Sequence, residues 1–314
     1  MRCLSVKTVI LLLLVAALLA LPLLGEVYYV KFATRALAYG IAALALDLVV
    51  GYGGLISFGH AAFVGIGAYT AGILAMQGVD NAFVVWPAAI IVAALVAGGV
   101  GALSLRTSGI YFIFVTLAFA QMIYYVAQSA RQYGGDDGFA LAASSRLPFG
   151  LSMGDANTLY YTVLVLLGLA LVLARLVVAS RFGRVIQGAR DNARRARSIG
   201  INVYPYQVVL FAISGGVTGL AGALLANVSS YIAPGQMDWI HSGDLLMMVI
   251  LGSAGTLLGP VLGAGIFVFF EQIMSDLTPH WMLILGPLLV ARVLFLHDGI
   301  FGLLVGRRTS AQSA

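Results

Sequence analysis

Long runs of apolar residues, separated by short polar segments, make up most of this chain. A helix that crosses a bilayer requires about 20 consecutive apolar residues, and the chain provides such lengths repeatedly. Backbone groups in lipid must bond within their own segment, and no alternating ten-residue strands occur, so the runs are predicted to be helices. The apolar runs are 9–24, 33–50, 54–77, 83–104, 110–128, 159–179, 206–227, 244–270 and 281–297. The pattern predicts an all-α, polytopic membrane helical bundle of about 8–10 spans, some broken or re-entrant, in one transmembrane domain over residues 1–314.

Basic residues suggest how the chain is oriented. Arg2 and Lys7 precede the first run, as they would in a signal peptide or in an uncleaved first span with its N-terminus inside. The later spans favour the uncleaved span. Counting one crossing per run places the mixed-charge loop at about residues 129–158 outside and the arginine-rich segment 181–197 inside, where basic loops are favoured.

The run 244–270 does not fit this count, because a single crossing would leave Arg307 and Arg308 outside. Small residues and a proline interrupt it, at Gly252, Gly255, Gly259 and Pro260. The two resulting pieces, of roughly 10–12 residues, are each too short to span. The run is therefore predicted to be a broken pair that returns to the outer side, so that the last span ends inside.

Composition excludes several classes of protein. Charged residues make up 9% and hydrophobic residues 61%, whereas a soluble domain carries roughly a quarter charged residues. The net charge of +5 has no nucleic-acid motif beside it, so nucleic acid is not an expected partner. Cys3 is the only cysteine, which excludes a disulfide framework and a cysteine-based metal site. No metal or cofactor is expected.

A second interrupted segment, rich in glycine, lies in the first half over residues 51–69. Interrupted hydrophobic segments in both halves are typical of a transport pathway. The candidate pathway residues are Asp47, Ser57, Gly59, His60, Gly65, Gly67, Tyr69, Gly255 and Gly259. An intramembrane carboxylate such as Asp47 is costly, so it either is functional or lies near the interface and caps the break at Gly51. His60 either lines the pathway or is hydrogen-bonded within the packing. The glycines, Gly215 and Gly219 among them, also suit close helix packing.

Six of the fifteen arginines fall between Arg181 and Arg197. At about 100° per residue, small apolar side chains share one face of a helix and arginines share the next. The apolar face holds Ile186, Ala189, Ala193 and Ala196, and the basic face holds Arg190, Arg194 and Arg197. Gly200 is predicted to end this helix, within a loop at about 180–205. The helix either docks into a groove of a cytoplasmic partner or lies on anionic lipid, and its small alanines favour docking.

No energy source is evident in the sequence. The only lysines are Lys7 and Lys31, and the chain has no Gly-x-x-x-x-Gly-Lys-Ser/Thr loop to hold ATP. It also has no Gly-x-Ser-x-Gly or His-Glu-x-x-His motif. The chain is therefore not expected to be an enzyme, and uphill transport would need an outside source of energy.

Several motifs occur together in one order. They lie at residues 51–69, 105–112, 116–121, 134–138, 183–184, 190–192, 200–202 and 252–260. With these motifs the chain resembles the LivM-like permease family of ABC importers for branched-chain amino acids, from about residue 35 to 300. It departs from the family at Ala193, at Arg197 and at residues 297–299.

The resemblance implies a function, partners and a location. The chain would be a permease subunit of an importer in the bacterial inner membrane, for branched-chain amino acids or for urea, amides or aromatic acids. A LivH-like permease or a second copy would be its partner, a periplasmic binding protein would deliver the solute, and two cytoplasmic ATP-binding subunits would dock on residues 184–200. The expected docking residues are Gly183, Arg184, Arg190, Asp191, Asn192, Arg194 and Gly200. Arg190 and Arg194 would face acidic groups of the ATPase.

The main alternative is a stand-alone secondary transporter or channel in which Asp47 or His60 titrates. It would need no ATPase.

Overall fold

The structure is a computed structural model that describes residues 18–24, 26–147 and 152–277, together with positions 280, 283, 286 and 287. Most of the first apolar run lies outside the described residues, and so does most of the last. The predictions for Arg307, Arg308 and residues 297–299 also lie outside them.

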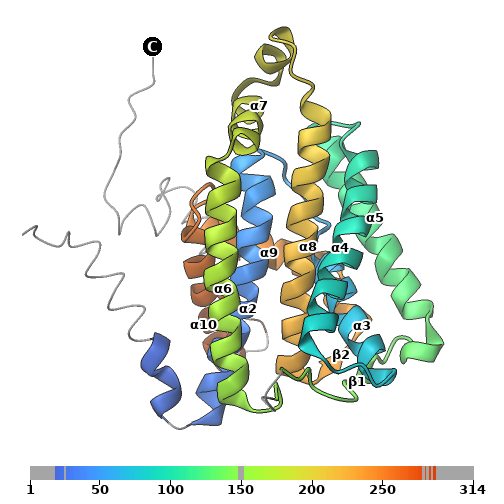
Figure 1. The fold of residues 1–314 in the computed structure, drawn as a ribbon, viewed down its shortest axis with the longest axis vertical. Coiled ribbons are helices and arrows are strands. Elements are labelled where there is room, and N and C mark those ends of the chain that lie inside the picture. The colour runs from blue at the N-terminus through green and yellow to red at the C-terminus, as the bar shows by residue number, and fades with distance from the viewer. Residues whose placement is uncertain are drawn as a thin grey trace, which may run out of the picture.

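Long helices packed side by side form the body of the molecule (Figure 1). They are α2 (Val27–Asp47), α4 (Ala82–Ser104), α5 (Ile110–Ser129), α6 (Ala156–Ala179), α8 (Val203–Ser229) and α10 (Gly259–Leu277). Counting α2 with the turn that follows it, the described residues contain 6 helices long and apolar enough to cross a membrane. The predicted polytopic helical bundle is confirmed.

The remaining helices and turns are shorter. The helices are α3 (His60–Met76), α7 (Arg181–Ser198) and α9 (Trp239–Gly252). The turns are η1 (Leu21–Leu24), the π-helical η2 (Leu48–Tyr52), η3 (Arg131–Tyr133) and η5 (Pro234–Met237). Polar side chains cap several helices, and this fixes where they begin. Asn81 accepts from the Phe83 amide at 3.0 Å, and Ser180 accepts from the Gly183 amide at 3.1 Å.

The two ends of the bundle differ (Figure 1). One end, the α7 end, carries the arginine-rich helix. The other, the strand end, carries β1 (Phe139–Ala140) and β2 (Tyr231–Ile232), which pair antiparallel with Phe139 opposite Ile232. Gly138 has a φ of +74°, and a Cβ there would meet the Ile232 carbonyl, which explains a glycine in this loop. The loop at 129–158 and the arginine segment thus lie at opposite ends, as the crossing count requires.

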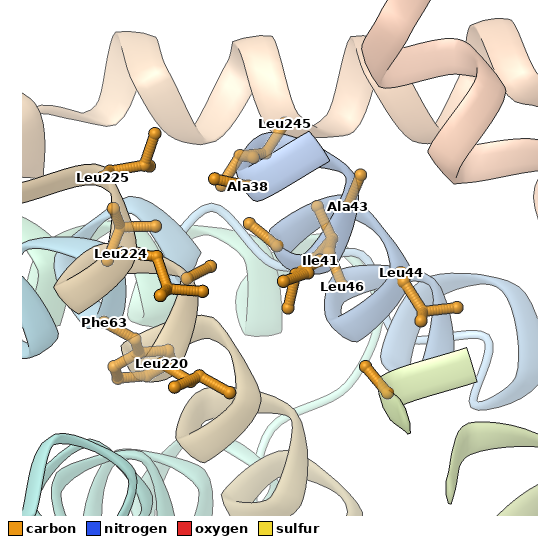
Figure 2. Close-up of a cluster of buried hydrophobic side chains, with 14 of the residues drawn as sticks. Ala38, Ile41, Ala43, Leu44, Leu46, Phe63, Leu220, Leu224, Leu225 and Leu245 are labelled. Carbon is orange, nitrogen blue, oxygen red and sulfur yellow. The ribbon is translucent and has the colours of Figure 1, made fainter. Parts of the chain in front are cut away.

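Helix α8 lies at the centre and packs against α2, α3 and α4. Glycines let the backbones approach closely: a Cβ on Gly215 or Gly219 would meet the Cβ atoms of α4 alanines, and one on Gly222 would meet the Val64 carbonyl. Close packing, one of the two roles considered for Gly215 and Gly219, is what the structure shows. Figure 2 shows the apolar side chains that gather around this contact, among them Ala38, Ile41, Leu44, Leu46, Phe63, Leu220, Leu224, Leu225 and Leu245.

Both predicted breaks are present, with altered lengths. Helices α9 and α10 pack against each other and are joined by the non-helical residues 253–258, where Gly255 has a φ of +78°. Helix α10 has 19 residues, because it continues past residue 270 to Leu277, and the prediction that this piece is too short to span is wrong. Gly259 and Pro260 occupy its first turn, where no N–H is needed. In the first half, the helix predicted from residue 54 begins only at His60, after an irregular stretch.

Candidate functional site

The irregular residues 53–59 are partly buried in the bundle, and backbone carbonyls of η2 and nearby side chains accept from several of their amides. The Phe58 amide donates to Thr116 Oγ1 at 3.2 Å, and the Gly59 amide donates to Ser57 Oγ at 3.2 Å. Ser57 and Gly59 are buried, as non-helical backbone at membrane depth must be. The stretch therefore has a defined shape.

His60 is fully buried and lies in a chain of hydrogen bonds. Its Nδ1 lies 3.2 Å from Ser57 Oγ and its Nε2 lies 2.9 Å from Ser214 Oγ, which donates to the Ala45 carbonyl at 2.5 Å. Because the Ser214 hydroxyl proton is used on Ala45, Nε2 carries the proton and donates, and Nδ1 accepts from Ser57. The ring of His60 also packs edge-on against Phe63 and Phe211, at 5.4 Å from each. His60 thus joins α2, α3 and α8 in the packing.

The two breaks meet at a junction formed by Asp47, Gly51 and Gly255. Asp47 is buried, and its Oδ1 accepts from the Gly255 amide at 2.7 Å. A Cβ on Gly51 would overlap both that carboxylate oxygen and the Gly255 backbone. Asp47 therefore caps the break of the second half of the chain, a contact that neither sequence interpretation of this residue anticipated. The junction lies where α2 ends, towards the α7 end of the bundle (Figure 1).

Helix α7 presents a basic surface, but it is not one straight helix. Of the predicted apolar face, Ile186, Ala189 and Ala196 are buried, and Ala193 is half-buried. Gly183 is buried as well. Asn192 has extended backbone angles (φ −159°, ψ 94°), and its Oδ1 accepts from the Arg195 amide at 2.9 Å. Asn192 thus caps a second helical piece. The single helix predicted over 184–200 is wrong, because this side chain competes for backbone donors in mid-segment.

Arg190 remains 44% exposed, but its guanidinium turns back to its own chain. Its Nη1 donates to the Gly51 carbonyl, and its Cγ lies where a Cβ of Gly54 would be. A carbonyl at a helix C-terminus lacks a helical partner, and the helix dipole attracts a cation there. The structure therefore brings together residues expected in two separate sites, the pathway and the docking helix.

The other predicted residues are dispersed. Gly65 faces the Met237 side chain, Gly67 faces the Gly219 carbonyl, and the Tyr69 ring packs against Phe139. Gly259 begins α10 beside Thr256. On the docking side, Gly183 lies tightly against backbone carbonyls of α6, and Gly200 has a φ of +85° just after α7 ends. The predicted docking residues Arg184, Arg190, Asp191, Asn192 and Arg194 are all exposed.

A cavity of about 360 Å³ lies between α2, α3, α8 and α9, near the strand end, and its polar lining was not foreseen. It is lined by Arg35, Tyr39, Ala61, Val64, Leu225, Val228, Ser229, Gln236, His241 and Leu245. Arg35 donates from Nη2 to both oxygens of Glu271, at 3.0 and 3.2 Å. His241 Nδ1 lies 3.1 Å from Asp244 Oδ2. The cavity thus combines apolar walls with two ion-pairing groups, in a volume that suits a small solute.

Sequence reasoning missed this cavity for an identifiable reason. Glu271 lies just past the end of the run 244–270, and it pairs with a residue 236 positions away, which no local pattern indicates. A signal was nevertheless present, because Arg35 lies within an apolar helix and an intramembrane charge needs a partner.

The Arg35–Glu271 pair gives a first prediction. Arg35→Met should lower the amount of folded protein in membranes several-fold, because it leaves a carboxylate unpaired at low dielectric. Adding Glu271→Gln to Arg35→Met should restore much of the loss. Quantitative immunoblotting of membranes checks this, and equal amounts of the single and double variants, both well below the unmodified protein, would contradict it.

Comparison with known proteins agrees with the architecture. The family described as "branched-chain amino acid transport system / permease component" matches residues 28–293. The high-affinity branched-chain amino acid transport system permease protein LivM of Escherichia coli is 28% identical over 295 residues, covering 86% of this chain and 69% of LivM. LivM of Salmonella typhimurium is 27% identical over the same shares.

A second group of relatives matches a shorter part. The autoinducer 2 import system permease protein LsrC of Salmonella paratyphi B is 33% identical over 123 residues, which are 36% of this chain and 34% of LsrC. No solved structure matches the chain. Since the family match extends over most of the sequence and the described helices form a membrane bundle, this multi-pass membrane protein belongs to the family of permease components of branched-chain amino acid transport systems.

Proposed function

We propose that this chain is the membrane-spanning subunit of an ABC importer for branched-chain amino acids or similar small polar solutes, driven by separate ATP-hydrolysing subunits that dock on α7. A LivH-like permease or a second copy would complete the pathway. A periplasmic binding protein would deliver the solute. The α7 end would then face the cytoplasm of a bacterial inner membrane.

The observation that carries the proposal is the form of α7. Its small apolar residues are buried against the bundle, whereas Arg184 and Arg194 remain exposed at one end of the molecule. A lipid-inserted helix would turn large apolar side chains outward, and the exposed face here is basic instead. Such a surface suits an acidic groove on a soluble partner.

The cavity near the strand end supports the import direction. Its lining includes Ser229 at the end of α8 and Gln236 of η5, on either side of β2 at the strand end, where a delivered solute would arrive under this proposal. Its apolar walls suit an aliphatic side chain, and its Arg35 and His241 groups suit the charged end of an amino acid. We propose it as part of the solute's route, with the LivM relatives supporting the solute class.

Reconstitution tests the proposal directly. The chain is co-purified with the permease, ATPase and binding protein encoded beside it, and radiolabelled leucine uptake is measured in proteoliposomes. ATP-dependent accumulation that requires every component is expected. Accumulation by the purified chain alone, driven by a proton or sodium gradient, would overturn the proposal in favour of a secondary transporter.

Charge reversal on α7 gives a second prediction. Arg184→Glu with Arg194→Glu should weaken binding of the ATPase subunits by about tenfold or more, because like charges then face the acidic groove. The control is Arg131→Glu, an exposed arginine near the strand end. Affinity is measured on detergent-purified components at low and high salt. Unchanged affinity in the double variant would contradict docking through these arginines.

A further inference from the structure

Three contacts join the two breaks at the junction formed by Asp47, Gly51 and Gly255. Asp47, in the last turn of α2, holds the Gly255 amide of the α9–α10 break at 2.7 Å. Gly51, one turn later, touches the Gly255 backbone so closely that no Cβ fits between them. The second oxygen of Asp47 is buried and has no hydrogen-bond partner among the described residues. The two interrupted segments are thus tied together by one carboxylate and one backbone contact.

Arg190 of helix α7 makes the third contact. Its guanidinium donates to the Gly51 carbonyl, and its aliphatic stem lies on Gly54. The guanidinium also lies close to Gly255, since a Cβ there would be 3.7 Å from Nη1. A single side chain of the docking helix therefore contacts the first break and lies beside the second.

We propose that Arg190 is a positioning residue that holds the Gly51–Gly255 junction closed, so that displacement of α7 releases it. In this inference, which rests on the proposed function, the arginine transmits movement of the ATPases to the interrupted helices. The guanidinium binds the C-terminal end of α2–η2, where the carbonyl lacks a helical donor and the dipole is negative. When α7 moves away, Gly51 loses this donor and the Asp47–Gly255 bond alone joins the breaks.

The geometry sets Arg190 apart from its neighbours. Arg190 is exposed on the same helix as Arg184 and Arg195, with 44% of its side chain accessible, and its hydrogen bond to Gly51 is what distinguishes it. Arg190 also pairs with Asp191, whose Oδ1 lies 3.5 Å from its Nε. Removal of Arg190 should therefore loosen the junction without changing the fold of the distant helices.

Amide hydrogen exchange of the full chain in lipid nanodiscs tests this without any ATPase. In Arg190→Ala, peptides covering residues 48–58 and 251–258 should exchange about tenfold faster, the effect of losing one charge-assisted hydrogen bond. Peptides from α4 should be unchanged. The matched control, Arg195→Ala, should leave both regions unchanged. Equal protection of the junction in Arg190→Ala and the unmodified chain would overturn the proposal.

A second variant and a second readout complete the test. If Arg190→Ala also speeds exchange in α4, its effect is global, and Arg190→Met, which keeps an aliphatic side chain over Gly54 but has no N–H donor, replaces it with the same two outcomes. In the reconstituted importer, Arg190→Ala should hydrolyse ATP while moving fewer solute molecules per ATP. Unchanged coupling in that importer would overturn transmission through Arg190. If no ATPase supports uptake by the unmodified chain, the proposed function fails, and the exchange result still decides whether Arg190 closes the junction.

Discussion

Gly51→Ala is expected to reduce solute uptake to background in the reconstituted importer. The added methyl group would occupy space held by Asp47 Oδ1 and by the Gly255 backbone, and backbone atoms cannot rotate away as a flexible side chain can. The Asp47–Gly255 hydrogen bond would break, and a buried carboxylate and a buried amide would lose their partners.

The matched control is Gly99→Ala in α4, where a Cβ would meet no atom within 4 Å. This variant should retain uptake, because alanine favours a helix interior over glycine. Uptake is measured on proteoliposomes matched for protein content. Near-normal uptake by Gly51→Ala would show that the two breaks need not touch for transport.

Gly67→Val is expected to lower the amount of protein in membranes by about tenfold, since overpacking a tight helix contact costs roughly 1–3 kcal/mol and small losses of stability change abundance strongly. A Cβ at this position would overlap the Gly219 carbonyl, so α3 and α8 would have to separate. Around them lies the apolar cluster of Figure 2, which would lose packing as well.

Gly168→Val in α6 is the corresponding control, because a Cβ there would meet no atom within 4 Å. Membrane fractions are compared by immunoblotting, and thermal stability is compared in detergent. Similar amounts of the two variants would mean that the α3–α8 contact is not essential for assembly.

The long helices could be predicted closely from the sequence. The run 110–128 corresponds to α5 (Ile110–Ser129), and the run 83–104 corresponds to α4 (Ala82–Ser104). This agreement has a physical cause. In lipid, an apolar segment of sufficient length has few alternatives to a helix, so its composition alone determines its structure.

The start of α3 could not be predicted in this way. Residues 53–59 are mostly apolar or small, like a helix, yet their backbone is irregular. The Phe58 amide is satisfied by Thr116 of α5 and the Gly59 amide by Ser57, and no local pattern indicates an acceptor supplied by another helix. Hydropathy measures transfer into an apolar environment and does not distinguish buried loop from buried helix.

The residues of the candidate site could be predicted from the sequence, but the contacts between them could not. Asp47, Gly255 and Arg190 were each singled out from the sequence, whereas their contact joins positions up to 208 residues apart. A helical wheel places Arg190 beside Arg194 on an exposed face. It cannot show that the long arginine side chain turns back to a carbonyl of its own chain.

The extended backbone at Asn192 divides α7 into two short helical pieces. Arg190 belongs to the piece before Asn192, next to the bundle, and Arg194 belongs to the piece after it. Rotation of the second piece can be taken up by the backbone angles at Asn192, as at a hinge, without moving the first piece. A partner bound only to the second piece would therefore transmit little movement to the bundle, whereas a partner that displaces the first piece would move Arg190 directly.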